Sequence, residues 1–305
     1  MKSRSLPIAI AAIVLTCLAG AAYGDSAPLG TASNYVVLYE GTGGHNLQIT
    51  NVNINGNIGV GGTGVVQFNG PATINGQVDF SASAAGQFHN NNGANVGPTS
   101  VDYSFTNVMS ALATVNSLSA SLGAELGTSL AISGTQTINA SSGTLQVVNG
   151  HQYRVFNITS YSETDGHVVT IVGDTAGDIV VLNFSSALGN VNLKGDVKLS
   201  GLTDDQVLWN FSGSGKNINL NTNASSFGSL AFQGDILGPD DILSMTNANL
   251  DGRFFGGDSA DMQIVSGSTL NTPTVAAVPE PSSLFLLGTG LLGMGGMLRR
   301  RVRPS

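Results

Sequence analysis

Histidine and aspartate side chains are the groups in this sequence that could hold a metal ion or transfer a proton. The four histidines, His45, His89, His151 and His167, show neither His-x-x-x-His nor His-x-His nor His-Glu-x-x-His spacing. A metal site or a catalytic triad would therefore need the fold to bring distant residues together. We expect surface loop histidines, and we predict no catalytic residue.

Three aspartates, Asp251, Asp258 and Asp261, form an acidic group near the C-terminal end of the main part of the chain. Their oxygen ligands would suit calcium in an extracellular setting. Neither the EF-hand loop nor the Gly-Gly-x-Gly-x-Asp repeat is present. We therefore interpret them as solvated turn acids and only weak calcium candidates, and we predict no metal and no cofactor.

The composition limits both the fold and the partners of the chain. Of 305 residues, 41 are glycine and 10% are charged, against a usual charged share of about 25%. Abundant Gly, Asn, Ser, Thr and Val favour strands and turns. Apart from its charged ends, the chain carries 18 acids and 5 bases, a net charge of −13. Such a surface repels phosphate backbones, so no nucleic-acid partner is expected.

The N-terminal residues 1–24 have the features of a secretory signal peptide. Two basic residues precede an apolar run over 6–22, and a small-x-small site ends at Gly24, before Asp25. Cleavage between Gly24 and Asp25 would also remove Cys17, the single cysteine. The mature protein would then contain no disulfide and no thiol nucleophile.

The C-terminal residues 279–305 combine three features in order. Pro279-Glu280-Pro281 comes first, and an apolar run over 284–298 follows. The run is at the short end of the membrane-spanning range, and we predict a C-terminal transmembrane helix in transient contact with the inner membrane through 282–298. The basic cluster that would hold its tail in the cytoplasm is Arg299, Arg300, Arg301 and Arg303.

This order, together with the signal peptide, closely resembles the PEP-CTERM sorting signal of Gram-negative bacteria. The resemblance implies export to the cell envelope, the cell surface or the extracellular matrix. It also implies a partner, a membrane-embedded exosortase-type sorting enzyme that cuts near the tripeptide. Pro279, Glu280 and Pro281 would be its recognition residues. Proline keeps this tripeptide out of helix and sheet interiors, so it would be extended and accessible.

Residues 25–272 read as one domain, followed by a linker over 273–278. Short alternating runs, such as Leu47-Gln48-Ile49 and Val191-Asn192-Leu193, indicate strands. The pairs Asn55-Gly56 and Asn75-Gly76 lie 20 residues apart and indicate turns. This texture predicts a mostly β protein with a single parallel β-solenoid, or β-helix; a two-sheet sandwich is the alternative.

Residues 100–127 break this texture. Their apolar residues recur at intervals of three and four, which predicts one long amphipathic helix that starts near Ser100 or Asp102 and stops at Gly127. The polar face lacks the basic residues of a membrane-surface helix, so we expect it to pack alongside the solenoid. The predicted stripe is Val101, Phe105, Val108, Leu112, Val115, Leu118, Leu122 and Leu126.

Strands, one helix and strands again resemble the ice-binding-like β-solenoid family. The opening over 29–38 and the segments over 232–237 and 248–253 carry the likeness. The segments over 180–184 and 207–211 also resemble choice-of-anchor A domains, which occur with interchangeable C-terminal anchors. Of the two families we favour choice-of-anchor A, which implies a non-enzymatic surface domain. The ice-binding-like resemblance implies that the helix lies along the solenoid axis.

Three functions follow from these observations. A structural or adhesive role in matrix or biofilm, with extracellular polysaccharide as a partner, is favoured. A secreted ice- or carbohydrate-binding module is the alternative, although Thr135-Gln136-Thr137 is the single Thr-x-Thr in this domain. A polysaccharide hydrolase or lyase is less favoured, because Trp209 is the only tryptophan and is expected to fill the core. Asp204-Asp205 and Asp240-Asp241 are interpreted as solvated turn acids.

Overall fold

The computed structural model describes one compact unit within Gly24–Ala276. Gly24, Asp25, the sorting tripeptide, the apolar run and the arginine cluster lie outside the described residues. In the part of the chain that is described, no helix is long and apolar enough to cross a membrane. The structure describes residues 26–82, 87–91, 96–98, 100–174, 178–213, 215–222, 231–257 and 260–274.

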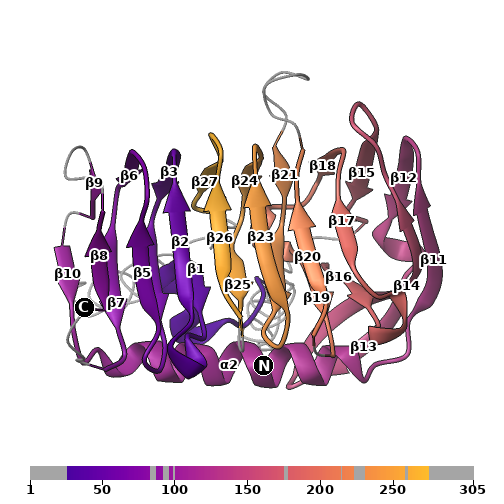
Figure 1. Ribbon diagram of the computed structural model, residues 1–305. Helices are drawn as coiled ribbons and strands as arrows, with labels where there is room; N and C mark the ends of the chain where they lie inside the picture. The colour runs from indigo at the N-terminus through magenta and orange to yellow at the C-terminus, as the bar shows by residue number, and fades with distance from the viewer. Residues whose placement is uncertain are drawn as a thin grey trace, which may run out of the picture. The chain divides into compact units, whose positions relative to one another are not determined.

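The strands form a parallel β-solenoid (Figure 1). Successive coils add one strand to each long sheet, and the strands of neighbouring coils pair in parallel. The solenoid prediction is confirmed. Sheet A contains, in spatial order, β10 (Ser100–Asp102), β7 (Gln77–Phe80), β4 (Asn57–Val60), β1 (Tyr35–Tyr39), β25 (Phe254–Gly256), β22 (Asp235–Gly238), β19 (Val207–Phe211), β16 (Ile179–Phe184), β14 (His151–Ser162) and β11 (Thr128–Ser133).

Three further sheets complete the coils. Sheet B contains β17 (Val191–Leu193), β20 (Asn217–Leu220), β23 (Ile242–Thr246), β26 (Met262–Val265), β2 (Asn46–Thr50), β5 (Val65–Phe68) and β8 (Phe88–Asn90). Sheet C contains β21 (Phe232–Gln233), β24 (Asn249–Asp251), β27 (Thr269–Asn271), β3 (Val52–Asn55), β6 (Ala72–Ile74) and β9 (Val96–Gly97). Sheet D contains β12 (Gln136–Asn139), β15 (Val168–Val172) and β18 (Asp196–Ser200).

The order of the coils in space differs from their order in the sequence. The chain starts in the middle with β1 and moves outward through β4 and β7 to β10. Helix α2 (Thr106–Gly123) then runs below the coils to the opposite end, where β11 begins (Figure 1). The later coils return to the middle, where β25 pairs with β1. The short strand β13 (Thr144–Val148) pairs antiparallel with β14.

Helix α2 packs on the outer surface of sheet A, as predicted. Its buried residues include Val108, Leu112 and Leu122, and they share a cluster with outward residues of sheet A such as Val181 and Leu208. Sheet A is therefore covered on both faces, which explains why β16 and β19 are buried along their whole length.

Both predicted ends of the helix are wrong by several residues, since it begins at Thr106 and ends at Gly123 rather than Gly127. Residues 100–102 form strand β10, because they extend sheet A beside β7 in parallel register. Phe105 precedes the first helical residue and Leu126 follows the last one. Both are exposed, at 36% and 78%, so they do not belong to the buried stripe.

The interior of the solenoid is filled by the inward side chains of the sheets. Trp209 is fully buried there, with its ring centroid 4.6 Å from that of Phe232, which confirms its predicted place in the core. At the corners, Asn75 Nδ2 donates to Asn55 Oδ1 over 2.7 Å. A Cβ on Gly76 would lie 2.3 Å from the Gly56 carbonyl oxygen, so the neighbouring coils approach too closely for a larger residue. The 20-residue spacing of these pairs is therefore one coil.

Candidate binding surface

The paired aspartates at the corners are not all solvated. Asp204, Asp205 and Asp241 are 2%, 3% and 2% exposed, which contradicts the interpretation as solvated turn acids; Asp240 is exposed. Asp241 Oδ1 accepts a hydrogen bond of 2.9 Å from the backbone of Lys216. Burial raises the pKa of Asp204 and Asp241. Asp204 and Asp241 accept hydrogen bonds from the backbone of Thr274 and Lys216, whereas Asp205 accepts one from the hydroxyl of Thr203 within its own turn.

The predicted acidic group near the C-terminus is not brought together in the described residues. Asp251 ends β24 in sheet C and accepts a hydrogen bond of 2.7 Å from Asn271 Nδ2. Asp261 precedes β26 in sheet B and accepts one of 2.8 Å from the Asn46 backbone. Asp258 lies outside the described residues. The two described aspartates therefore serve different sheets, because the chain turns a corner between them.

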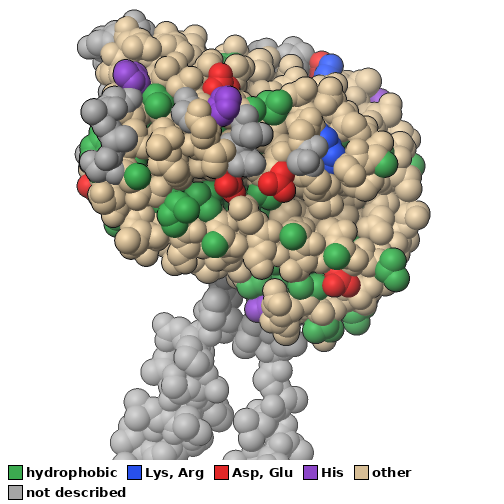
Figure 2. Space-filling view, turned by 60° about the horizontal axis from the view of Figure 1, so that its bottom comes forward, with side chains coloured by type: hydrophobic (Ala, Val, Ile, Leu, Met, Phe, Trp, Pro, Cys, Tyr) green, Lys and Arg blue, Asp and Glu red, His purple; other side chains and the backbone are tan. Residues whose placement is uncertain are grey.

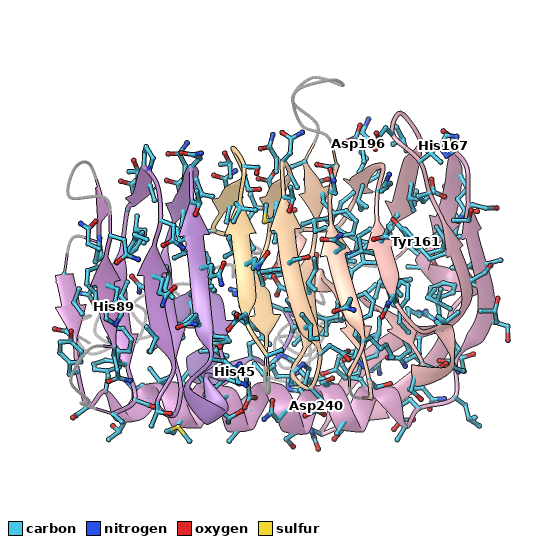
Figure 3. The ribbon with its side chains drawn as sticks, viewed as in Figure 1. His45, His89, Tyr161, His167, Asp196 and Asp240 are labelled. Carbon is cyan, nitrogen blue, oxygen red and sulfur yellow. The ribbon has the colours of Figure 1, made fainter. Side chains whose placement is uncertain are left out.

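His45, His89 and His167 lie on separate parts of the solenoid (Figure 3). His89 is in strand β8 and His151 begins β14, so the expectation of loop histidines is wrong for both. His167 Nδ1 lies 3.2 Å from the buried carboxylate of Glu163, whose pKa is raised by burial. Within the described residues no group of three His, Cys, Asp or Glu is placed to hold a metal ion.

A continuous line of polar side chains crosses the outer surface of sheet B, which faces the viewer in Figure 1. Register places one residue of each strand in this line, and each is half-buried or exposed. We call this line the polar rank. In spatial order it contains Asn192, Asn219, Ser244, Gln263, Gln48, Gln67 and His89.

The polar rank follows from strict alternation in short strands. In β20 the buried Ile218 and Leu220 flank Asn219, so the amide must point outward. The Ser244 hydroxyl donates to Asn219 Oδ1, and Gln48 Nε2 donates to Asp261 Oδ2 over 3.4 Å. The first bond joins two members of the rank, whereas the second joins the rank to a carboxylate beside it. Amide and hydroxyl side chains of the rank present both donors and acceptors.

A shallow groove of about 510 Å³ lies at one end of the polar rank. Its lining comes from β17, β20, β23 and β26 and from the residues that precede them. The outward side chains of these sheet B strands carry neither a carboxylate nor a basic group. Figure 2, in which the bottom of the molecule comes forward, shows few and scattered charged side chains on that side as well. One carboxylate, that of Asp261 just before β26, also lines the groove, 3.6 Å from His45 Nδ1. The groove therefore combines amide and hydroxyl groups with a single acid at its edge.

The sequence also carries a signal for this surface. Leu47-Gln48-Ile49 and Val191-Asn192-Leu193 indicate more than strands. Each is an apolar–amide–apolar triplet, and Val66-Gln67-Phe68 is another. Aligning such triplets at the coil period would have placed their amides on one face.

The geometry defines a solenoid with a neutral polar surface, and the sequence comparison gives its family. Residues 19–263 match the ice-binding-like adhesive domain family, so the chain belongs to that family. Residues 277–301 match the PEP-CTERM protein-sorting motif. The resemblances to the ice-binding-like family and to the PEP-CTERM signal are confirmed, and the assignment to choice-of-anchor A domains stays a prediction. The motif is a signal for export to the Gram-negative cell envelope or surface and for processing by an exosortase-type enzyme.

Solved structures similar to this chain include three described as ice-binding proteins. One from an Antarctic Biological Consortium has 16% identity and a TM-score of 0.48 over 83% of this chain and 93% of that one. LeIBP from Arctic yeast has 16% identity and a TM-score of 0.49 over 84% and 97%. The DUF3494 domain of ice-binding protein 1 from Shewanella frigidimarina has 13% identity and a TM-score of 0.49 over 83% and 100%. Likeness at this level carries no argument about binding. No curated protein matches the chain.

Proposed function

We propose that this chain is an exported surface protein, processed at its sorting tripeptide, whose solenoid has an adhesive or structural role through binding of neutral extracellular polysaccharide. The polar rank on sheet B is the observation that carries the proposal. It extends over seven strands without a charged outward side chain within them.

The chemistry of the polar rank matches sugar hydroxyls. Amide side chains donate and accept hydrogen bonds at once, as hydroxyl groups do. Neighbouring coils lie about 4.8 Å apart, so an extended polymer chain could bond to several coils in turn. The single tryptophan, Trp209, is buried and offers no sugar platform. Affinity would therefore come from many weak contacts along the rank.

Several acids that a hydrolase could use instead make structural hydrogen bonds. Asp204 and Asp241 are buried and bonded to backbone groups. Asp251 accepts from Asn271 across sheet C. These observations support a binding protein without catalytic activity.

Ice binding is the second candidate, and one observation favours it. Thr246, Val265 and Thr50 align on three adjacent strands of sheet B and present hydroxyl and methyl groups in one row. The row is short, and the longer polar rank beside it consists mainly of amides. We therefore place polysaccharide before ice.

The test compares two faces of the same solenoid. The mature protein, purified from the envelope, is assayed for retention on insoluble neutral glucans and galactans, on a polyuronate and on growing ice. A variant combining Gln48→Ala, Asn219→Ala and Gln263→Ala should lose retention on a neutral polysaccharide. The control combines Asn53→Ala, Thr73→Ala and Thr269→Ala, which form an outward row on sheet C.

The outcomes separate the candidates. Retention on a neutral polysaccharide that only the sheet B variant loses supports the proposal. Capture by ice alone favours the second candidate. Absence of retention on every surface, or equal loss in both variants, would contradict a binding role for the polar rank.

A further inference from the structure

The two ends of the solenoid each expose an edge of sheet A. In the part of the chain that the structure describes, β10 pairs only with β7, and β11 pairs only with β14. The two strands lie at opposite ends of the coils, and α2 runs from one end to the other (Figure 1). An edge strand presents unpaired backbone N–H and C=O groups, which can pair with a strand of another chain.

Exposed apolar side chains gather at the β10 side of the solenoid. Tyr103, Phe105 and Met109 follow β10 or lie in the first turn of α2, and they are 46%, 36% and 52% exposed. The Tyr103 ring stacks on that of Phe80 at a centroid distance of 5.2 Å. Phe80 belongs to the solenoid core, so Tyr103 covers the core at this end. We call β10 with Tyr103, Phe105 and Met109 the β10 end.

A second apolar group follows the last turn of α2. Leu126 is 78% exposed, and Leu145 and Val147 of β13 are 48% and 64% exposed. The Gln146 side chain donates to the Leu126 carbonyl oxygen over 2.7 Å, which holds Leu126 beside β13. We call β11 with Leu126, Leu145 and Val147 the β11 end. Among the described residues, the large exposed apolar side chains all belong to these two ends.

A second copy of this chain is the partner that the two ends fit. The strands on the main path of sheet A are all parallel, so a copy moved along the solenoid axis would bring its β10 beside β11 of the first copy in parallel orientation. A contact of this kind exists within the protein: β1 pairs with β25, β2 with β26 and β3 with β27, where no chain connection joins the two coils. One coil can therefore stack on another without a covalent link.

The strand edges alone are too small to hold two copies together. Strand β10 contains three residues, and Gln136 Nε2 already donates to the Ala131 carbonyl oxygen of β11 over 3.5 Å. Burial of apolar surface is the main favourable contribution to most protein association. The apolar side chains of the two ends must therefore supply most of the contact, and the strand edges set its orientation.

We propose that copies of this protein associate head to tail, with the β10 end of one copy against the β11 end of the next. The two surfaces differ, so every bound pair keeps one free end of each kind and the assembly grows as a filament. The ten strands on the main path of sheet A, at a spacing of about 4.8 Å, give an axial repeat of about 48 Å. This inference depends neither on the sorting motif nor on polysaccharide binding.

The test measures the mass of the mature protein, purified from the envelope, by sedimentation velocity over a series of concentrations. One variant blocks the β10 end with Phe105→Lys and Met109→Lys, four residues apart at the start of α2. The other blocks the β11 end with Leu145→Lys and Val147→Lys, which alternate along β13 and so lie on one side of it. Each variant places two charges in the contact and leaves the other end unaltered.

The matched control carries two lysines away from both ends. It combines Ala113→Lys and Ser117→Lys, which are exposed and have the same four-residue spacing in the middle of α2. Equal melting midpoints show that the variants are folded. If lysine unfolds β13, Leu145→Thr with Val147→Thr keeps the preference for strand and should weaken association severalfold.

The unaltered protein and the control should form species larger than dimers as the concentration rises, and electron micrographs should show filaments with a repeat of about 48 Å. Each blocked variant alone should stay monomeric at the same concentrations. An equimolar mixture of the two should form 1:1 dimers, because it offers one free β10 end and one free β11 end.

Three results would overturn the head-to-tail contact. The first is an unaltered protein that stays monomeric at every concentration, including one that binds phosphatidylcholine vesicles through these apolar side chains instead. The second is a mixture of the blocked variants without dimers. The third is a blocked variant that associates as strongly as the control, which would indicate a symmetric contact or a contact elsewhere.

Discussion

Val37 of β1 pairs in parallel register with Phe254 of β25, although 217 residues separate them in the sequence. The early and late coils meet at this pair and continue one another without a chain connection there. Helix α2 links the two sets of coils along sheet A, with buried contacts to both. The helix and the long-range strand pairing therefore join the early and late coils into one solenoid.

The docked helix gives the first prediction. Leu112 is 5% exposed between α2 and sheet A, so Leu112→Asp should place an unpaired charge there and destabilise the protein by about 3 to 5 kcal/mol. Thermal unfolding measures the effect. The matched control is Ser117→Asp, because Ser117 lies on the exposed face of the helix, whereas the neighbouring Asn116 is half-buried. Equal melting midpoints for the two variants would mean that the helix does not dock.

Two buried asparagines beside the helix, Asn210 and Asn183, give the second prediction, and we call them the asparagine ladder. Asn210 Nδ2 donates to the Ser119 carbonyl oxygen over 3.0 Å and to Asn183 Oδ1 over 2.8 Å, and its own Oδ1 accepts from the Ser119 hydroxyl over 2.6 Å. Asn210→Ala leaves these groups unpaired and should cost about 1 to 3 kcal/mol in chemical denaturation. The exposed Asn192→Ala should cost almost nothing. A cost for Asn210→Ala no larger than for Asn192→Ala would contradict the ladder's role.

Stability should increase as the pH falls from 7 to 5. Burial raises the pKa of Asp235 to about 6 from 3.8, despite the neighbouring Arg253, and raises those of Asp204 and Asp241 as well. A raised native pKa means that the folded state holds the proton more tightly. Its stabilisation is complete below the unfolded pKa and is lost as the pH rises through the native pKa.

The predicted gain from Asp235 alone is about 1 kcal/mol between pH 7 and pH 5. Urea unfolding at the two pH values measures it. A lower free energy of unfolding at pH 5 would contradict the burial of these acids.

The proposal that the chain binds without catalysing a reaction is also testable. The purified surface form should release no reducing ends from plant, algal or bacterial polysaccharides. Alanine at Asp204, Asp240, Asp251 or Asp258 should therefore change no activity. Cleavage that disappears in one of these variants would assign the chain to the hydrolases or lyases.

Local patterns were sufficient to predict the coils and the helix. Alternation in Leu47-Gln48-Ile49 fixes which side chains point inward, and Leu112 lies on the stripe that the helical spacing indicated. The start of the helix was misplaced because Val101 happens to continue the spacing, whereas its backbone pairs with β7. Local spacing cannot report such a partner.

The pairing of β1 with β25 and the burial of Asp204 could not be read from the sequence. Both depend on which segments meet after the chain has turned back along the helix. Asp204 beside Asp205 has the composition of an exposed turn, yet it is buried and accepts hydrogen bonds from Thr274, which is 70 positions further along the chain. The polar rank could not be predicted either, because its residues align only when the register between coils is known. The number of residues per coil varies, so the sequence alone does not give that register.

The most direct test of the account is mass spectrometry of the intact protein isolated from the envelope of its own cells. We predict an N-terminus at Asp25 and a C-terminus near Pro279 to Pro281, with the arginine cluster removed. The measurement requires no assumption about the ligand. A mature surface form that still carries Arg299, Arg300, Arg301 and Arg303 would contradict processing at the sorting tripeptide, and with it the proposed route to the cell surface.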